Sequence, residues 1–459
     1  MVRLFRFTVM GLLMLAVLLS GCALLAGPQR PVIPTPIPTA PPLSELLTLN
    51  GDVVVDPVSD VVPEVDQSIV DLLNLVSQQQ LVSYVQTLEN FYTRNSFSNA
   101  ESDTRGIGAA RRWISSEFKR VGNGRIQVEF DDFDLTYAGF YAPQQNVVAS
   151  LPGSGPGNGV IIVMAHYDNR PTEIADGVTR ATGADDNASG VALLLESARV
   201  LSAYNWNQTI KFVAMAAEEQ GTVGSRHFAQ TAFLDNMNVL AAINYDAVGG
   251  RAGIPQYVRL FAPDLLTSPS GGLARYYEYI GGLYLPTFPV VVYDALDREG
   301  RWGDHREFVN VGWPAIRIIE SEEDPDLLNS NLDTWSLVDY NYLQKVVQLN
   351  VAVAANMAGA PATPPSPTIA DMAEPGSFLL TWPVDPTVAG YAISFRPLSS
   401  PSYPPFRFVK GLAAGNVALT NLDPGATYAV SMTALDEYGR VGDFSPEVII
   451  GPGTQVSMP

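Results

Sequence analysis

Apolar and polar residues follow two recurring patterns along the middle of the chain. Short, largely apolar runs are typical of strands buried on both faces of a sheet, whereas apolar residues spaced three and four apart predict amphipathic helices. Buried strands are predicted at 159–168, 209–219, 239–249 and 314–320, half-buried strands at 125–133 and 145–153, and helices at 66–92, 105–122, 189–203, 222–233, 270–281 and 336–358.

This alternation predicts an α/β domain over residues 66–359. Its central sheet is expected to be mixed but mostly parallel and covered by helices on both faces, because strands separated by helices form parallel crossovers. In such a sheet, ligands bind where the strands end at their carboxyl side. The polar residues that follow the buried strands are therefore the first candidates for chemistry.

The first 22 residues are predicted to be a targeting segment. Arg3 and Arg6 precede an apolar stretch that is too short for a transmembrane helix. The stretch ends in LSGC, which resembles a bacterial lipobox and would make Cys22 the lipidated first residue of the mature protein. This resemblance implies an extracytoplasmic protein held to a bacterial membrane by a lipid anchor. Because Cys22 is the only cysteine, no internal disulfide is expected.

Proline-rich segments divide the rest of the chain. Residues 23–65 are predicted to form an extended tether, and residues 360–368, APATPPSPT, a linker. Beyond the linker, residues 369–455 resemble a fibronectin type III domain, which implies an all-β sandwich with Trp382 on one sheet and Tyr428 on the other. Such a domain is expected to act as a spacer or to contact a cell surface or polysaccharide.

The amino-acid composition of the chain limits the kinds of binding partner that are expected. Hydrophobic residues make up 47% of the chain and charged residues 16%, so most of it is expected to be globular. The formal charge of −20 argues against a nucleic-acid partner, which requires a basic surface.

Charged side chains stand where three of the predicted buried strands end. His166 and Asp168 close the first, Glu218 and Glu219 the second, and Asp246 the third. The pair Asp185 and Asp186 lies in the loop that enters the next helix. So many acids meeting at one sheet edge would repel one another, and a divalent cation removes that repulsion. The pattern predicts a metal site.

The chain is similar to zinc exopeptidases related to bacterial leucyl aminopeptidase and glutamate carboxypeptidase. The resemblance covers roughly residues 75–358 and implies a mixed-sheet α/β fold, a peptide substrate and two metal ions, usually zinc. The segments that carry it are AHYD at 165–168, GADDNASG at 183–190, AAEEQGTVGS at 216–225, NYDAVG at 244–249 and GDHREFVNVGWPAI at 303–316.

The resemblance also implies a role for each polar residue. Asp186 bridges the two metals and is followed by a cis peptide bond to Asn187, which leaves Asp185 or Ser189 for the turn and the helix start. His166 and Asp246 complete one metal site, and Glu219 holds the other metal. Glu218 is the general base, and Asp168 orients His166.

One position departs from the family pattern. Where the family has its last histidine ligand, four residues before an Asp-Thr pair, this chain has Asn329. An amide binds zinc more weakly than imidazole, so the second metal is expected to be weak, absent or not zinc. His305 is the alternative source of an imidazole. His227 is expected to be structural or at the surface.

Three functions follow from these residues. The first is a metal-dependent exopeptidase, most directly an aminopeptidase, whose specificity loops lie at 250–310. The second is a relative of glutaminyl cyclases, which share this fold and use one zinc, held by the counterparts of Asp186, Glu219 and the missing histidine. The third is a binding protein on a peptidase scaffold, an alternative that retention of Glu218 disfavours.

Overall fold

The computed structural model describes residues 65–155, 159–410 and 415–452, together with short strands at 47–49, 53–55 and 454–455. The predicted signal peptide, with Cys22, lies outside the described residues. So does most of the predicted tether. No helix in the described part of the chain has both the length and the apolar composition needed to cross a bilayer.

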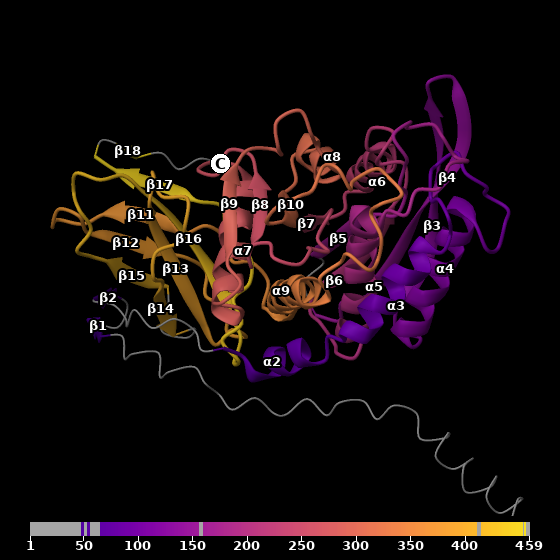
Figure 1. Ribbon diagram of the computed structural model, residues 1–459. Coiled ribbons are helices and arrows are strands. Elements are labelled where there is room, and N and C mark those ends of the chain that lie inside the picture. Colours follow the sequence, from indigo (N-terminus) through magenta and orange to yellow (C-terminus); the bar gives the residue numbers. More distant parts are fainter. Residues whose placement is uncertain are drawn as a thin grey trace, which may run out of the picture. The chain divides into compact units, whose positions relative to one another are not determined.

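A single mixed sheet forms the centre of the α/β part of the chain (Figure 1). Its strand order is β3-β4-β6-β5-β7-β10-β8-β9. The inner strands β6, β5, β7 and β10 run parallel, while β3 and β4 pair antiparallel with their neighbours and β8 pairs antiparallel with β10 and parallel with β9, which confirms the predicted fold class. The strands are β3 Gln127–Tyr137, β4 Phe140–Leu151, β5 Val160–His166, β6 Thr209–Met215, β7 Val239–Tyr245, β8 Val258–Ala262, β9 Val290–Asp294 and β10 Ala315–Glu320.

Helices cover both faces of this sheet because its central strands are apolar on both sides. Alternate residues of β5 belong to different cores: Ile161 and Val163 pack with the helices α5 and α9, whereas Ile162 and Met164 pack with α6 and α8. The helices are α2 Gln67–Asn74, α3 Gln78–Glu89, α4 Gly106–Gly122, α5 Gly190–Leu201, α6 Val223–Leu234, α7 Pro269–Tyr284, α8 His305–Asn310 and α9 Tyr340–Gly359.

The predicted helix at 66–92 is two helices in the structure. Asp66 begins α2 by accepting a hydrogen bond from the Ser68 amide, and Ser77 begins α3 by accepting one from the Gln80 amide. A serine cap in the middle of an apolar pattern therefore marks a second helix start.

The strands β8 and β9 lie in the region 250–310, which was expected to be loops. Both are short. The mostly buried β8 pairs antiparallel with β10, and the partly exposed β9 forms the sheet edge beside β8. The place of β8 in the sheet depends on pairing with a strand more than fifty residues away, which a local pattern does not reveal.

Antiparallel sheets follow α9, as the sequence predicts. One has the order β14-β13-β16-β17-β18 and the other β1-β2-β15-β12-β11. Trp382 directly follows β12 of one sheet and Tyr428 begins β16 of the other, so the two residues lie as expected, while the fibronectin type III assignment stays a prediction. The strands are β11 Thr368–Asp371, β12 Phe378–Thr381, β13 Gly390–Pro397, β14 Arg407–Lys410, β15 Asn416–Leu419, β16 Tyr428–Leu435, β17 Val448–Gly451 and β18 Thr454–Gln455.

Part of the predicted tether forms paired strands rather than an extended spacer. Strands β1 (Leu47–Leu49) and β2 (Val53–Val55) pair with each other, and Val54 pairs in parallel with Val417 of β15. The Val53-Val54-Val55 stretch thus joins a C-terminal sheet.

Candidate metal centre

Two of the predicted metal ligands come from neighbouring parallel strands. His166 is the last residue of β5, and Asp246 directly follows β7, which pairs with β5. Since both strands run in the same direction, their carboxyl ends bring the imidazole and the carboxylate to the same edge of the sheet. Both side chains are buried.

Asp186 reaches the same edge from a loop. It lies in the one-turn helical segment η1 (Ala184–Ser189), where the Asp186–Asn187 peptide bond is cis, as the resemblance implied. The Asp333 carboxylate holds this loop by accepting hydrogen bonds from the amides of Asp185 and Asp186, at 2.8 and 3.0 Å. Asp333 was noted in the sequence only as part of an Asp-Thr pair.

These three side chains form a compact donor group. His166 Nε2 lies 3.2 Å from Asp186 Oδ1 and 3.3 Å from Asp246 Oδ1. One ligand atom from each residue lies within 4.8 Å of the others, and among the described residues this is the only such group of three or more. One imidazole and two carboxylates are a donor set that zinc accepts, so these residues fit the ion that the resemblance implies.

The charges of the group show why it favours a cation. Burial alone would lower the pKa of His166, but Asp246, Glu218 and Asp186 raise it well above its ordinary value. Burial would raise the pKa of Asp246, but the Arg317 guanidinium, 2.8 Å from its Oδ2, and His166 hold it well below its ordinary range. Asp246 is therefore ionised and ready to bind a cation through Oδ1.

Glu218 and Glu219 lie in the turn that follows β6 and line the same pocket. Burial, Asp246 and Glu219 raise the pKa of the Glu218 carboxyl well above its ordinary value, against the effect of His166. Burial and Asp186 raise the pKa of Glu219 to about 8, against the effect of Arg170. The two neighbours differ in their contacts, because Glu219 forms an ion pair with Arg170 at 2.7 Å.

Asp168 contacts His166 in a different way from that predicted. The imidazole Nδ1 lies 3.0 Å from the backbone carbonyl oxygen of Asp168, whereas the nearer carboxylate oxygen is 3.7 Å away. The Asp168 carboxylate instead accepts hydrogen bonds from the backbone amides of Glu218 and Glu219, at 3.1 and 3.2 Å. It positions the turn that carries both glutamates.

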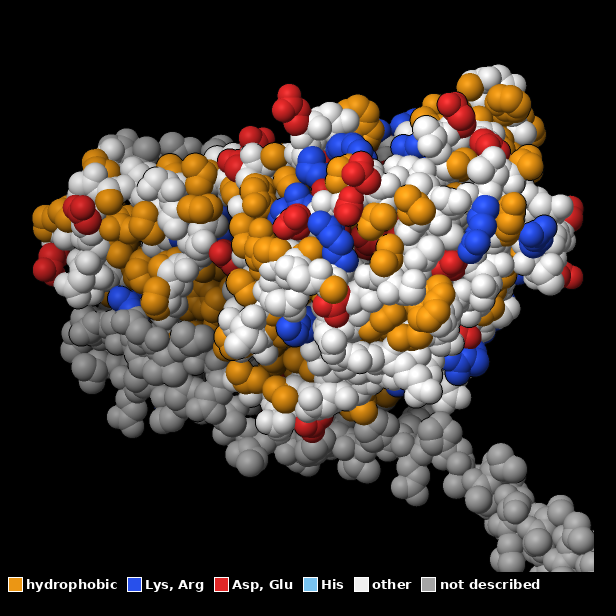
Figure 2. All heavy atoms as spheres, viewed as in Figure 1, with side chains coloured by type: hydrophobic (Ala, Val, Ile, Leu, Met, Phe, Trp, Pro, Cys, Tyr) orange, Lys and Arg blue, Asp and Glu red, His pale blue; other side chains and the backbone are white. Residues whose placement is uncertain are grey.

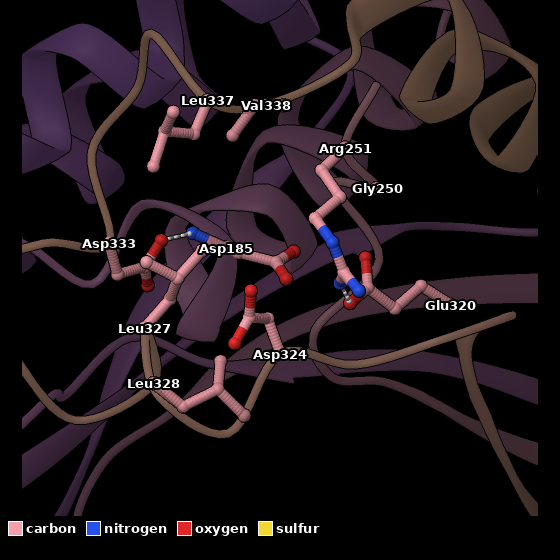
Figure 3. Close-up of a pocket in the computed structure, with 10 residues that line it drawn as sticks. All are labelled: Asp185, Gly250, Arg251, Glu320, Asp324, Leu327, Leu328, Asp333, Leu337 and Val338. Atoms are coloured by element: carbon pink, nitrogen blue, oxygen red, sulfur yellow. Dashed lines mark hydrogen bonds and ion pairs between the residues drawn. The ribbon is translucent and has the colours of Figure 1, made fainter. Parts of the chain in front are cut away.

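Asp185 and Asp186 face different pockets. The Asp185 carboxylate lies in a small pocket with Glu320, Asp324 and Arg251, and it accepts a hydrogen bond from the Gly249 amide at 2.6 Å (Figure 3). Burial, Glu320 and Asp333 raise its pKa well above the ordinary value. Asp185 thus fastens the metal loop to the segment after β7.

The start of α5 corrects one prediction. Neither Asp185 nor the Ser189 side chain caps the helix; the Asn187 side chain accepts a hydrogen bond from the Gly190 amide at 3.0 Å and donates one to the Tyr245 carbonyl at 2.9 Å. Asn187 is fully buried, so a single amide side chain satisfies both the helix start and the end of β7.

The remaining histidines do not join the metal group. His305 is buried, its Nε2 lies 2.7 Å from the Leu296 carbonyl oxygen, and burial lowers its pKa to about 4. It does not replace the missing imidazole. His227 is partly exposed, stacks on Phe133 and pairs with Asp131 at 3.1 Å, consistent with a structural role.

Asn329 lies beside Glu219 and lines the pocket, as its place in the sequence predicted. In the amide orientation that satisfies its neighbours, its nitrogen donates to Glu219 Oε1 at 3.0 Å and its oxygen accepts from Arg170 at 3.2 Å. Both polar atoms of the Asn329 amide therefore contact protein groups.

Several arginines that build the site were not predicted from the sequence. Arg94 is buried and donates to the carbonyls of Tyr167 and Gly183, on both sides of the loop between β5 and η1. Arg170 and Arg317 pair with Glu219 and Asp246. Only the positions of these arginines in the sequence could have indicated their role. Arg170 lies two residues after Asp168, and Arg317 lies in a mostly apolar strand.

Further basic and aromatic side chains line the mouth of the pocket. Arg298, Arg301 and Trp302 belong to the region predicted to set specificity, and Glu323 and Leu328 lie outside it. Figure 2 shows acidic and basic side chains close together near the middle of the face drawn, where Figure 1 places β8, β10 and α8.

Known proteins resemble this chain in sequence. The profile of Peptidase family M28 matches residues 146–354. A "Probable zinc metalloprotease" of Pyrenophora tritici-repentis is 29% identical over 432 residues, covering 84% of this chain and 98% of its own. A protein of the same name from Pyricularia oryzae is 31% identical over 394 residues, covering 76% and 78%. Both relatives are fungal.

Solved structures share the fold. An aminopeptidase from Aneurinibacillus sp. strain AM-1 is 18% identical, with a TM-score of 0.52 over 64% of this chain and 97% of its own. A glutaminyl cyclase from Porphyromonas gingivalis is 24% identical, with a TM-score of 0.50 over 61% of this chain and 98% of its own.

A mixed α/β sheet with an imidazole and two carboxylates gathered at the carboxyl edge of its central strands is the arrangement expected of a metal-dependent hydrolase. The sequence relatives make the class specific. The chain belongs to peptidase family M28 and is a zinc metallopeptidase.

Proposed function

We propose that this metallopeptidase is an exopeptidase that removes residues from the free amino terminus of peptides, outside the cytoplasm and anchored to a membrane through Cys22. The observation that supports the chemistry is the grouping of His166, Asp186 and Asp246 in one pocket with Glu218. The choice of aminopeptidase follows the resemblance to leucyl aminopeptidase. The anchor follows the lipobox resemblance.

Different groups in the pocket carry out different steps of hydrolysis. When bound, zinc supplies a Lewis acid that polarises the scissile carbonyl and lowers the pKa of water. Glu218 accepts a proton from the attacking water and delivers it to the nitrogen of the leaving amine. Glu218 lines the same pocket as the three metal ligands, which places its carboxyl where it can pass the proton on.

Neighbouring groups keep these residues in place. The Asp168 carboxylate holds the backbone of the turn that carries Glu218, through the amides of Glu218 and Glu219. Arg317 is bonded to Asp246 at 2.8 Å and to Asp297 at 2.6 Å, so the Asp246 carboxylate has a fixed orientation. Both supporting side chains are buried.

The two alternative functions fit these contacts less well. A cyclase of the single-zinc kind would require Glu219 as a metal ligand, and Glu219 is paired with Arg170 and Asn329. A binding protein has no use for a buried carboxyl such as Glu218 beside the metal ligands.

Hydrolysis of a peptide panel tests the proposal. The zinc-loaded protein is expected to release the first residue from peptides with a free amino terminus and to leave N-acetylated copies intact. Glu218→Gln should lower kcat by about 10²–10⁴-fold with unchanged zinc content, because the base is lost while the metal ligands remain. The exposed Glu299 provides the matched control, and Glu299→Gln should keep wild-type activity.

Each alternative gives a different result in the same panel. Cyclisation of N-terminal glutamine with release of ammonia would support a cyclase. Cleavage of N-acetylated peptides from the carboxyl end would assign a carboxypeptidase. Zinc binding with no turnover of any peptide would indicate a binding protein.

A further inference from the structure

The second metal position that the resemblance implies does not fit the residues of this chain. That position requires Glu219 with an oxygen available and an imidazole at position 329. In the structure, Glu219 Oε2 accepts a hydrogen bond from Arg170 Nε at 2.7 Å. With the Asn329 amide turned to the orientation that satisfies its neighbours, Oε1 accepts one from its nitrogen at 3.0 Å. Both carboxylate oxygens therefore have protein partners.

Arg170 and Asn329 also bond to each other. The Asn329 oxygen accepts from the terminal nitrogen Nη2 of Arg170 at 3.2 Å, which closes a ring of three side chains. The side chain of Glu219 is 8% exposed and that of Arg170 is 20% exposed, so this ring is largely shielded from water.

All three nitrogens of the Arg170 guanidinium donate to protein acceptors. Its Nη1 donates to the carbonyl oxygens of Pro171 and Thr172, at 3.3 and 3.2 Å, while Nε and Nη2 serve Glu219 and Asn329. A guanidinium stays protonated at any physiological pH. It therefore places a fixed positive charge against Glu219, where the family has a cation.

We infer that Arg170, held by Asn329, takes the place of the second metal ion and that the chain binds one ion, at His166, Asp186 and Asp246. The inference rests on the metal centre of the proposed function and not on its substrate. A second dication beside a fixed guanidinium would meet electrostatic repulsion, would compete with Arg170 and Asn329 for the Glu219 oxygens, and would find no imidazole. Among the described residues, the one group with metal-ligand spacing excludes Glu219.

Metal stoichiometry tests the inference. The full chain is loaded with excess zinc, desalted and measured by inductively coupled plasma mass spectrometry and native mass spectrometry. Wild type should hold one zinc per chain. Arg170→Ala combined with Asn329→His should hold two, because the guanidinium is removed and the imidazole is restored. Asn329→His alone should still hold one, since Arg170 remains paired with Glu219.

Cobalt gives a second readout. Two Co²⁺ ions that share Asp186 couple magnetically, whereas a single ion does not, so electron paramagnetic resonance should show coupling only in the double variant. Arg120→Ala is the control, since Arg120 is 60% exposed and pairs with Glu117 of α4, and its loss should leave one ion.

Two outcomes would overturn the inference. One is wild type with two tightly held ions. The other is a double variant that keeps the wild-type circular dichroism and melting temperature yet binds only one. Two ions with normal peptide hydrolysis would leave the proposed function intact, whereas one ion without hydrolysis would overturn that function and leave the inference standing. No bound metal would contradict both.

Discussion

His166 presents its two ring nitrogens to different partners. Nδ1 lies 3.0 Å from the Asp168 carbonyl oxygen, which can only accept a hydrogen bond, so Nδ1 carries the proton. Nε2 faces Asp186 and Asp246, and it offers its lone pair to a cation once its own proton has left. A backbone carbonyl thus fixes the tautomer that binds a metal.

The carboxylate of Asp168 is left for a different task. It is fully buried, and it accepts from the amides of Glu218 and Glu219 and from the Ser96 hydroxyl, the last at 3.4 Å. Burial raises its pKa, although His166 and the two amides oppose this. One side chain therefore links the end of β5 to the turn after β6.

Asp168→Asn should lower kcat/KM by about 10–100-fold. The asparagine keeps the size and the backbone carbonyl, so His166 retains its tautomer, but one carboxylate acceptor becomes a donor that faces an amide. The glutamate turn should move and zinc affinity should change little. Peptide hydrolysis together with a zinc competition titration measures the two effects separately.

Asp176 offers a matched control for this substitution. It lies in the same loop, and its exposed carboxylate accepts from the amides of Val178 and Thr179, at 2.8 and 2.9 Å. Asp176→Asn should keep wild-type kinetics. If Asp168→Asn weakened zinc binding and left kcat unchanged, its role would be to orient His166 rather than Glu218.

At the scale of elements, the loops of the metal centre are joined by Arg94. This fully buried side chain donates to the carbonyls of Leu88, Tyr167, Thr182 and Gly183, at distances of 2.7 to 3.1 Å. The acceptors come from the end of α3, the residue after β5 and the entry to η1. Burial lowers the pKa of Arg94 to about 10, and Asp333 and Asp168 partly offset this effect.

Arg94→Lys should cost about 2–4 kcal/mol of unfolding free energy. A lysine keeps the charge, but its single ammonium cannot reach carbonyls spread around a guanidinium fork, and buried acceptors remain unpaired. Zinc affinity should fall as well, because the entry to Asp186 loses its support. Urea unfolding of the zinc-loaded and zinc-free protein measures both effects.

A surface arginine provides the control for the Arg94→Lys substitution. Arg105 is exposed and lies over the Tyr92 ring, 4.3 Å from its centre, so Arg105→Lys should change the unfolding free energy by less than about 0.5 kcal/mol. Equal effects of the two substitutions would show that Arg94 does not bind the loops together.

The elements that the sequence predicted well are those fixed by local periodicity. The apolar runs of β5, β6, β7 and β10 match the structure within a few residues, and the polar residues at their ends meet because parallel strands end at a common edge. His166 and Asp246 therefore follow from the pattern alone. The placement of Asp186 also required the family resemblance.

What the sequence did not predict depends on contacts between distant segments. The strands β8 and β9 depend on pairing that a short window does not contain. The same holds for Arg170, whose partner Glu219 is 49 positions away. A charged residue in a loop is usually solvated, so nothing local distinguishes a buried ion pair from an exposed charge.

At the scale of the whole molecule, ion pairs join the C-terminal sheets to the peptidase part of the chain. Arg396 of β13 is fully buried and pairs with Glu447, which also pairs with Arg275 of α7 at 3.1 Å. Arg396 donates in addition to the Leu266 carbonyl at 2.6 Å. Elsewhere, Arg440 pairs with Asp66 at the start of α2, at 2.7 Å.

These contacts modify the role predicted for the C-terminal domain. A spacer on a flexible linker would share few buried groups with its neighbour. Here Tyr276 of α7 is buried and donates to the Val441 carbonyl at 2.7 Å, and Ala360, at the start of the predicted linker, is fully buried. The two parts are therefore expected to unfold together. Contact with a surface or polysaccharide stays a prediction.

Glu447→Ala should uncouple the two parts. It leaves Arg396 and Arg275 buried without their shared carboxylate, at a cost of about 2–4 kcal/mol. Differential scanning calorimetry should show one transition for wild type and a separate, earlier transition for the variant, since the C-terminal sheets lose their hold on α7. Peptide hydrolysis at 25 °C should be retained, because no residue of the metal centre contacts Glu447.

The exposed Glu374 is the control, and Glu374→Ala should keep the single wild-type transition. An unshifted single transition for Glu447→Ala would mean that apolar packing alone holds the two parts together.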